Sequence, residues 1–184
     1  MNNPATMKKV AIDIGHARLT GARGCGYDEH TQCAIIATHL KRKLESFKVL
    51  NIQADIIDFP ELNNSGDLAA AVRAINAGKY DCCVSLHMDC SDNPAARGAH
   101  VCYTSAKGKQ LAQEIALRLC PQLPGRAEQT VKRPGLYILK YTRPVTVLAE
   151  CGFISHPGDA EWVASHPDRV ALPIALGIAA YLES

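Results

Sequence analysis

Residues 147–155, VLAECGFIS in one-letter code, decide how the rest of the chain is interpreted. Three apolar residues lead directly into the acidic residue Glu150, and Gly152 follows two positions later. An unbroken apolar run of this kind is typical of a buried strand in a parallel or mixed sheet. A carboxylate at the C-terminal end of such a strand would emerge at the edge where α/β proteins place their chemistry.

Two other predicted strands end in a histidine. The segments VAIDIGH and CCVSLH end at His16 and His87. Because the C-terminal ends of parallel strands meet at one edge of a sheet, His16, His87 and Glu150 are expected to lie near one another. Glu29, at the start of a predicted helix, can reach the same edge.

The rest of the chain alternates strands with helices. Strands are predicted at residues 8–16, 51–59, 82–87, 99–105, 136–140 and 144–151, and helices at 28–47, 65–78, 107–119, 160–165 and 170–182. This alternation predicts an α/β fold, a single mixed, largely parallel twisted sheet flanked by helices. Ser65 is the expected cap of the second helix, and residues 121–134 are expected to be loop. We expect one domain over residues 1–184, with a flexible N-terminus at 1–7.

Composition limits the possible functions. The 184 residues carry a formal net charge of +2, which is too small to indicate a nucleic-acid partner. No apolar run is long enough to cross a membrane, and the first apolar segment is too short for a signal peptide. The sequence therefore predicts a protein made in the cytoplasm, without nucleic-acid binding or membrane insertion.

The eight cysteines contain no Cys-x-x-Cys pair, which argues against zinc-finger and thioredoxin-type sites. Several of them occupy positions where apolar residues are expected. Buried free thiols that behave as small hydrophobic side chains are the better interpretation.

His16, Glu29 and His87 are suitable ligands for a catalytic zinc ion, which typically has three protein ligands and an open fourth position. Glu150 is then available to handle protons. The spacing fits no local zinc motif such as His-Glu-x-x-His, and scattered histidines are more often structural than metal-binding. The residues alone therefore leave both interpretations open.

Several segments carry a family resemblance. They are IDIGH (12–16), Gly21-Ala22, GYDE (26–29), VSLH (84–87), NPAARG (93–98), LYIL (136–139) and VLAECGFIS (147–155). In this order they resemble the zinc-dependent N-acetylmuramoyl-L-alanine amidases of the Amidase_3 type, and the similarity runs from about residue 8 to 182. Separated signatures in the right order are much more specific than any one of them alone.

The resemblance implies one zinc ion held by His16, Glu29 and His87, with Glu150 as the catalytic glutamate. It also implies the reaction, which is cleavage of the amide between the lactyl group of N-acetylmuramic acid and L-alanine in peptidoglycan. In this role Glu150 would take a proton from water and deliver it to the departing nitrogen.

Three positions depart from the family pattern. Ala17 replaces a glycine, Asp89 stands where asparagine is frequent, and His156 replaces another asparagine. None is one of the four functional positions. These differences leave the preference for particular stem peptides open.

Other polar residues are given weaker roles. His30 is expected at the surface, because neighbours on a helix point about 100° apart and His30 adjoins Glu29. His100 is expected to be exposed, opposite its apolar strand neighbours. Asp13 has two equal alternatives, supporting a ligand histidine or a structural role. Cys151 is expected to face the core, which argues against a cysteine nucleophile.

Two other functions remain as alternatives: a catalytically inactive peptidoglycan-binding module, and a zinc peptidase or deacetylase. The absence of wall-binding repeats, an inhibitory insert and a signal peptide resembles a phage endolysin of a Gram-negative host. Such a protein would be a monomer that reaches the cell wall after release or delivery. A bacterial amidase whose signal was removed and a toxin-like effector are further possibilities.

Overall fold

The computed structural model describes residues 6–184, apart from the side chain of Asn64. Most of the expected flexible N-terminus, residues 1–5, lies outside the described residues. The helices are α1 (Glu29–Glu45), α2 (Asn64–Ala77), α3 (Ala106–Leu119), α4 (Tyr137–Tyr141), α5 (Pro157–Ser165) and α6 (Pro167–Glu183). The strands are β1 (Lys8–Ile14), β2 (Arg23–Gly24), β3 (Tyr27–Asp28), β4 (Ile52–Ile57), β5 (Cys82–Asp89), β6 (His100–Tyr103), β7 (Thr130–Lys132) and β8 (Val145–Phe153).

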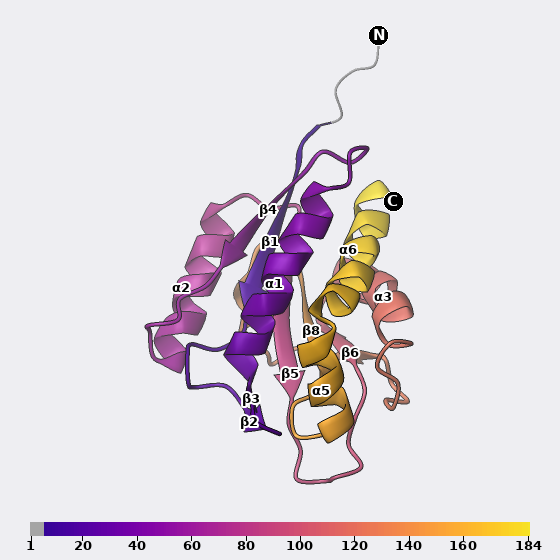
Figure 1. Ribbon diagram of the computed structural model, residues 1–184. Helices are drawn as coiled ribbons and strands as arrows, with labels where there is room; N and C mark the ends of the chain where they lie inside the picture. Colours follow the sequence, from indigo (N-terminus) through magenta and orange to yellow (C-terminus); the bar gives the residue numbers. More distant parts are fainter. Residues whose placement is uncertain (1–5) are drawn as a thin grey trace.

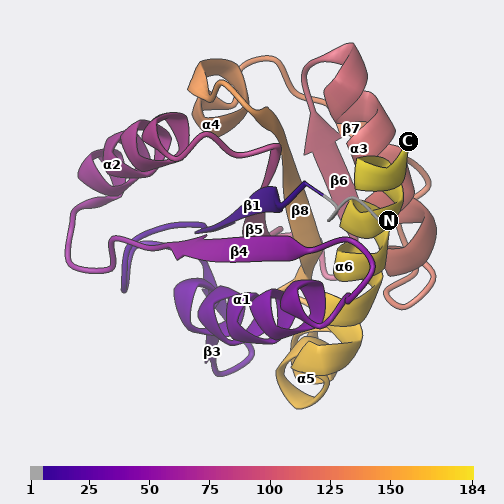
Figure 2. The ribbon, with the colours of Figure 1, turned by 90° about the horizontal axis from the view of Figure 1, so that it is seen from above.

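Six strands form one sheet in the order β4-β1-β5-β8-β6-β7. Strands β4, β1, β5 and β8 are parallel, β6 runs antiparallel to β8, and β7 is parallel to β6. The strands fan out across the sheet, as the usual twist requires (Figure 2). The predicted mixed, largely parallel sheet flanked by helices is therefore confirmed.

Helices cover both faces of the sheet (Figures 1 and 2). Helices α1, α3 and α6 pack on one face, and α2 and α4 on the other. Alternation along β8 separates the two packing clusters, because Val147, Ala149 and Cys151 belong to the first and Leu148 to the second. Glu150 projects on the same side as Leu148, at the end of the strand.

Helix α1 follows from local sequence signals. The Asp28 side chain accepts a hydrogen bond from the Thr31 backbone N–H at 3.0 Å, which caps the helix. Its buried positions recur with helical spacing and face the sheet: Cys33, Ile36, Ala37, Leu40 and Leu44. The cap fixes where the first turn begins, and so places Glu29 at the C-terminal edge of the strands.

Three local predictions are wrong. Residues 136–140 are not a strand, because Tyr137–Tyr141 forms the short helix α4. In this helix Ile138 and Leu139 point towards the sheet and pack in the second cluster. The segment expected to be loop contains β7, which pairs with β6. Asn63, not Ser65, caps α2 by accepting a hydrogen bond from the Gly66 backbone N–H at 2.8 Å.

No helix among residues 6–184 is both long enough and apolar enough to pass through a membrane. All eight cysteines are free, and six of them are buried. The buried thiols confirm the interpretation of those cysteines as small hydrophobic side chains, while Cys25 and Cys90 are exposed.

Candidate metal centre

Three separate elements bring His16, Glu29 and His87 together at the C-terminal edge of the sheet. His16 follows β1, Glu29 is the first residue of α1, and His87 lies in β5. One possible ligand atom from each residue lies within 4.8 Å of the other two. Glu29 Oε2 is 3.5 Å from His16 Nε2, and Glu29 Oε1 is 3.0 Å from His87 Nδ1.

These separations suit a zinc ion. Two atoms bound about 2.0–2.1 Å from a tetrahedral zinc lie roughly 3.3 Å apart. The two measured separations, 3.0 and 3.5 Å, are of this size, although they run to the two different oxygens of Glu29. The donor set of two imidazoles and one carboxylate also matches the chemistry of catalytic zinc sites. The residues present therefore fit the metal that the sequence predicts.

Backbone groups fix the Glu29 carboxylate in place. The Ala22 N–H donates to Oε2 at 2.7 Å, and the Met88 N–H donates to Oε1 at 3.1 Å. Burial acts to raise the pKa of Glu29, but the hydrogen bond and charge of His87, with smaller contributions from His16 and Ala22, hold it below its ordinary value. Glu29 is therefore ionised, as a metal ligand must be.

A glycine makes the approach of His87 possible. A Cβ atom at Gly15 would lie 2.3–2.6 Å from three atoms of the His87 ring, which is far too close for any side chain. The Gly15 N–H also donates to the Leu86 carbonyl at 2.9 Å, which extends the contact between the ends of β1 and β5. Gly15 therefore lets the imidazole lie directly against the backbone.

His16 occupies an uncommon backbone conformation. Its φ of 63° lies in the left-handed region, which is unfavourable for a residue with a Cβ atom. The conformation directs its ring towards His87, with the ring centroids 5.0 Å apart in an edge-on arrangement. The strain thus occurs where two possible ligands converge.

Glu150 lies beside this cluster. It is directly opposite His87 in the β5–β8 register, so both side chains project from the same face. Its Oε2 atom is buried and has no hydrogen-bond partner among the described residues. Burial is the main cause that raises the pKa of Glu150 to about 7, helped by Asp89 and Glu29 and opposed by His87 and Arg126. Glu150 can therefore exchange a proton near neutral pH.

Two histidines are placed differently from expectation. His30 is not at the surface; it is buried, and its Nε2 lies 3.0 Å from the Asp58 carboxylate. His100 is only 3% exposed. It lies on the same face of β6 as Cys102, and that face packs in the second cluster instead of facing solvent. Neither histidine belongs to the ligand cluster found among the described residues.

Asp13 and Cys151 have structural surroundings. Asp13 accepts a hydrogen bond from the Ser85 hydroxyl at 2.5 Å. It also lies near His87 and His16; burial raises its pKa, while the charges of these histidines act to lower it. Both alternatives for Asp13, a structural role and support of a ligand histidine, are consistent with these contacts. Cys151 is fully buried in the first packing cluster, as expected from the alternation along β8.

Sequence reasoning missed several groups around the cluster. The Ala22 and Met88 N–H groups are backbone donors, which no side-chain motif can indicate. Arg126 and Arg133 come from the segment predicted to be loop, and both act electrostatically on His100. The pairing of β7 with β6, which the sequence pattern did not reveal, and the backbone hydrogen bond from Ala99 to Leu123 bring this segment to the site.

The fold and the cluster together define an α/β protein with a candidate His–Glu–His metal centre beside a buried acid. Residues 10–180 match the Amidase_3 family, described as N-acetylmuramoyl-L-alanine amidase. The chain belongs to this family.

Known proteins show the same relationship. The chain is 29% identical over 192 residues to the N-acetylmuramoyl-L-alanine amidase LytC of Bacillus subtilis, covering 98% of this chain but only 37% of LytC. The catalytic domain of the CD27L endolysin targeting Clostridia Difficile superposes with a TM-score of 0.83 at 25% identity, covering 94% of this chain and 97% of that domain. The amidase Ami1 of Mycobacterium smegmatis shares the fold, with a TM-score of 0.85 at 20% identity over 99% of both chains.

Proposed function

We propose that this chain is a zinc-dependent peptidoglycan amidase. It would hydrolyse the amide between the lactyl group of N-acetylmuramic acid and L-alanine of the stem peptide. Family membership and the likeness to LytC support the reaction. The observation that carries the proposal is the convergence of His16, Glu29 and His87, with Glu150 next to His87 in the register.

His16 Nε2, His87 Nδ1 and a Glu29 carboxylate oxygen would hold the metal. A bound zinc ion supplies two effects at such a site: it makes water more acidic, and it polarises a carbonyl as a Lewis acid. The two backbone hydrogen bonds to Glu29 keep its carboxylate oriented before any ion binds. Such support from surrounding groups usually strengthens metal affinity.

Glu150 would act on protons. Its side chain faces the same side as His87, and its buried Oε2 atom has no hydrogen-bond partner in the part of the chain that the structure describes. Its pKa of about 7 suits both the uptake and the release of a proton at neutral pH. In the proposed reaction Glu150 takes a proton from the attacking water. It then delivers this proton to the L-alanine nitrogen as the amide bond breaks.

The substrate class sets the proposed location and partner. A peptidoglycan amidase made in the cytoplasm must be released or delivered to reach the cell wall. We propose that the protein acts there as a monomer with one zinc ion. Size-exclusion chromatography with light scattering tests the monomeric state, and metal analysis of the same fractions tests the number of zinc ions per chain.

Zymography on purified sacculi tests the activity. We expect clearing that a chelator abolishes and added zinc restores. Mass spectrometry of the products should show free peptides that begin with L-alanine, together with intact glycan. Clearing that survives chelation would contradict zinc dependence. Fragments cut within the peptide, or loss of acetyl groups alone, would instead indicate a peptidase or deacetylase, and binding without release would indicate an inactive module.

A further inference from the structure

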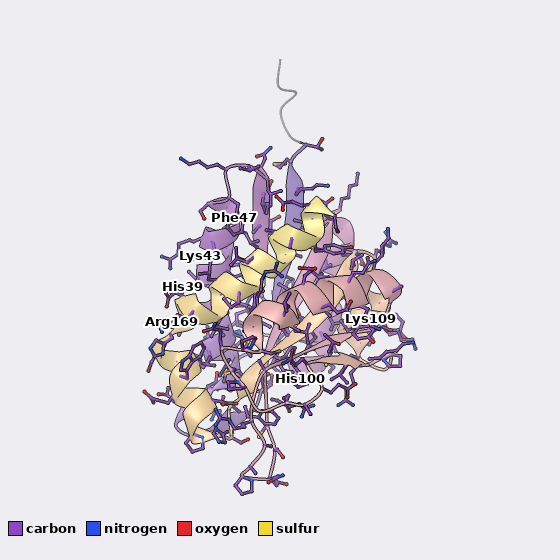
Figure 3. The ribbon with its side chains drawn as sticks, turned by 90° about the vertical axis from the view of Figure 1, so that its right-hand side faces the viewer. His39, Lys43, Phe47, His100, Lys109 and Arg169 are labelled. Carbon is purple, nitrogen blue, oxygen red and sulfur yellow. The ribbon has the colours of Figure 1, made fainter. Side chains whose placement is uncertain are left out.

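Glu150 has a second polar neighbour on the side away from the ligand cluster. His100 is its direct partner in the antiparallel β6–β8 register, so Glu150 lies between His87 and His100 across the sheet. The His100 Nδ1 atom is buried and has no hydrogen-bond partner among the described residues. Its Nε2 atom is 4.0 Å from the Asp89 carboxylate, too far for a hydrogen bond. Figure 3 shows His100 towards the end of the molecule opposite Phe47.

Two arginines flank this side of the site. The Arg126 guanidinium lies 5.9 Å from the ring centroid of Phe153, at the end of β8. The Arg133 backbone N–H donates to the Tyr103 carbonyl at 2.8 Å, which fixes Arg133 beside β6. Burial, followed by the charges of Arg126 and Arg133, lowers the pKa of His100 to about 4. His100 is therefore neutral at neutral pH.

These two positive charges are not compensated. No described carboxylate lies within ion-pair distance of Arg126 or Arg133. Three other arginines at the same end of the sheet have partners: Arg18 with Glu61 at 3.1 Å, Arg23 with Asp28 at 3.3 Å, and Arg97 with Asp159 at 3.4 Å. The Arg133 side chain is hydrogen-bonded to Cys102, which shares the His100 face of β6, so its guanidinium lies on that face. The β6 side of Glu150 therefore carries two arginines without an ion pair among the described residues, and a neutral imidazole.

We propose that Arg126, Arg133 and His100 form a subsite that binds the free α-carboxylate of the D-glutamate residue in the stem peptide. This subsite rests on the proposed amidase function. In peptidoglycan, D-glutamate follows L-alanine and continues the chain through its γ-carboxyl group, which leaves the α-carboxylate free unless it is amidated. The sugar side of the cleaved bond carries no comparable anion, because the lactyl carboxyl group is itself part of the amide.

The chemistry and the dimensions agree with this assignment. A planar guanidinium matches a carboxylate through paired hydrogen bonds, which is the interaction arginine makes best. One extended peptide residue spans about 3.5 Å, and neighbouring strands lie about 4.8 Å apart. The residue after L-alanine therefore reaches the β6 side when the broken bond lies beside Glu150. The leaving peptide would then pass over β6 and β7.

The test compares two dipeptides that differ in one group, L-alanyl-D-glutamate and its α-amide, L-alanyl-D-isoglutamine. Calorimetry should show that the unchanged protein binds the carboxylate form about 10 to 100 times more tightly, the usual range for a charge-assisted hydrogen bond. The double variant Arg126→Gln, Arg133→Gln should lose this preference. Arg143→Gln removes an equal charge at the opposite edge of the sheet, so it should keep the preference.

Kinetics on the matching muramyl dipeptides gives a second measurement. The double variant should raise KM for the acid form by about 10 to 100 times and leave kcat and the amidated substrate little changed. The single variants should each show part of this effect and serve if the double variant does not fold. Equal binding of both dipeptides by the unchanged protein, or a preference kept by the double variant, would overturn the subsite. Dipeptide binding needs no hydrolysis, so a preserved preference without amidase activity would refute only the proposed reaction.

Discussion

The two sides of the candidate site differ in how well their polar groups are satisfied. On the ligand side, each Glu29 carboxylate oxygen accepts a backbone N–H and lies close to a histidine. On the acid side, Glu150 Oε2 and His100 Nδ1 are buried without a partner among the described residues. Buried polar groups are normally hydrogen-bonded. The contrast therefore indicates that the ligand side is organised in advance, whereas the acid side is completed by water or substrate.

The largest expected effect comes from removing the acid. Glu150→Gln should lower kcat on sacculi by about 10²–10⁴-fold, because it removes the group that moves the proton. Metal content should not change, since Glu150 is not in the ligand cluster. Glu183→Gln, at the exposed end of α6, is the control. Activity retained in Glu150→Gln would remove this residue from the mechanism.

The contrast also predicts opposite effects on stability in the metal-free protein. Glu29→Gln should lower the free energy of unfolding at pH 7 by about 1–3 kcal/mol, because hydrogen bonds to a charged group are lost. The pKa of Glu29 is lowered by folding, so its contribution is present above its ordinary pKa of 4.5 and fades as pH falls. Urea unfolding at several pH values measures this.

Glu150→Gln should instead stabilise the metal-free protein. Folding raises the pKa of Glu150 from 4.5 to about 7, so the folded state holds more protons between these pH values and loses stability as pH rises. The variant should gain nothing below pH 4.5 and up to about 3 kcal/mol above pH 7. If both glutamine variants moved stability in the same direction, the contrast between the two sides would be wrong.

A smaller effect tests the close packing on the ligand side. Gly15→Ala should weaken zinc binding by about 10–100-fold, as displaced supporting groups commonly do, because its Cβ would collide with the His87 ring. Gly135→Ala is the matched control, since nothing lies within 4 Å of its Cβ position. Competition with a coloured chelator measures the affinity. Wild-type affinity in Gly15→Ala would show that this close approach is not needed.

The smallest expected effect is that of thiol alkylation. An alkylating reagent should label the exposed thiols of Cys25 and Cys90, and this labelling should leave the activity unchanged. The six buried thiols should remain unmodified in the folded protein, because burial raises their pKa and blocks access. Inactivation that follows labelling of Cys151 would support the alternative in which this cysteine is the nucleophile.

The strand ends were predictable because their signals are local. Apolar runs that end in His16, His87 or Glu150 identify buried strands, and parallel strands place such ends at one edge. The capping residue Asp28 likewise fixes the start of α1, and with it Glu29. These features depend on a few neighbouring residues.

The errors share one cause, which is contact with distant segments. Residues 137–141 favour a strand by composition, yet packing on the second cluster makes them a helix, and tertiary contacts commonly override such preferences. His100 alternates with apolar neighbours, as an exposed residue would. It is buried because its face of β6 packs in the second cluster, which includes residues from much later in the chain.

The sequence by itself determined the class of fold and the order of most elements, because periodicity and strand ends depend on short stretches of chain. The four residues proposed for chemistry were singled out by the family resemblance of separated sequence segments, which the spacing alone could not do. Only the tertiary structure decided the 3.0 and 3.5 Å separations around Glu29 and its backbone donors. It also decided that Glu150 Oε2 and His100 Nδ1 are buried without a hydrogen-bond partner among the described residues. These distances and buried atoms depend on the register between strands and on segments from elsewhere in the chain that pack over the site. Interatomic distances are fixed to within a few tenths of an ångström only when those elements pack together.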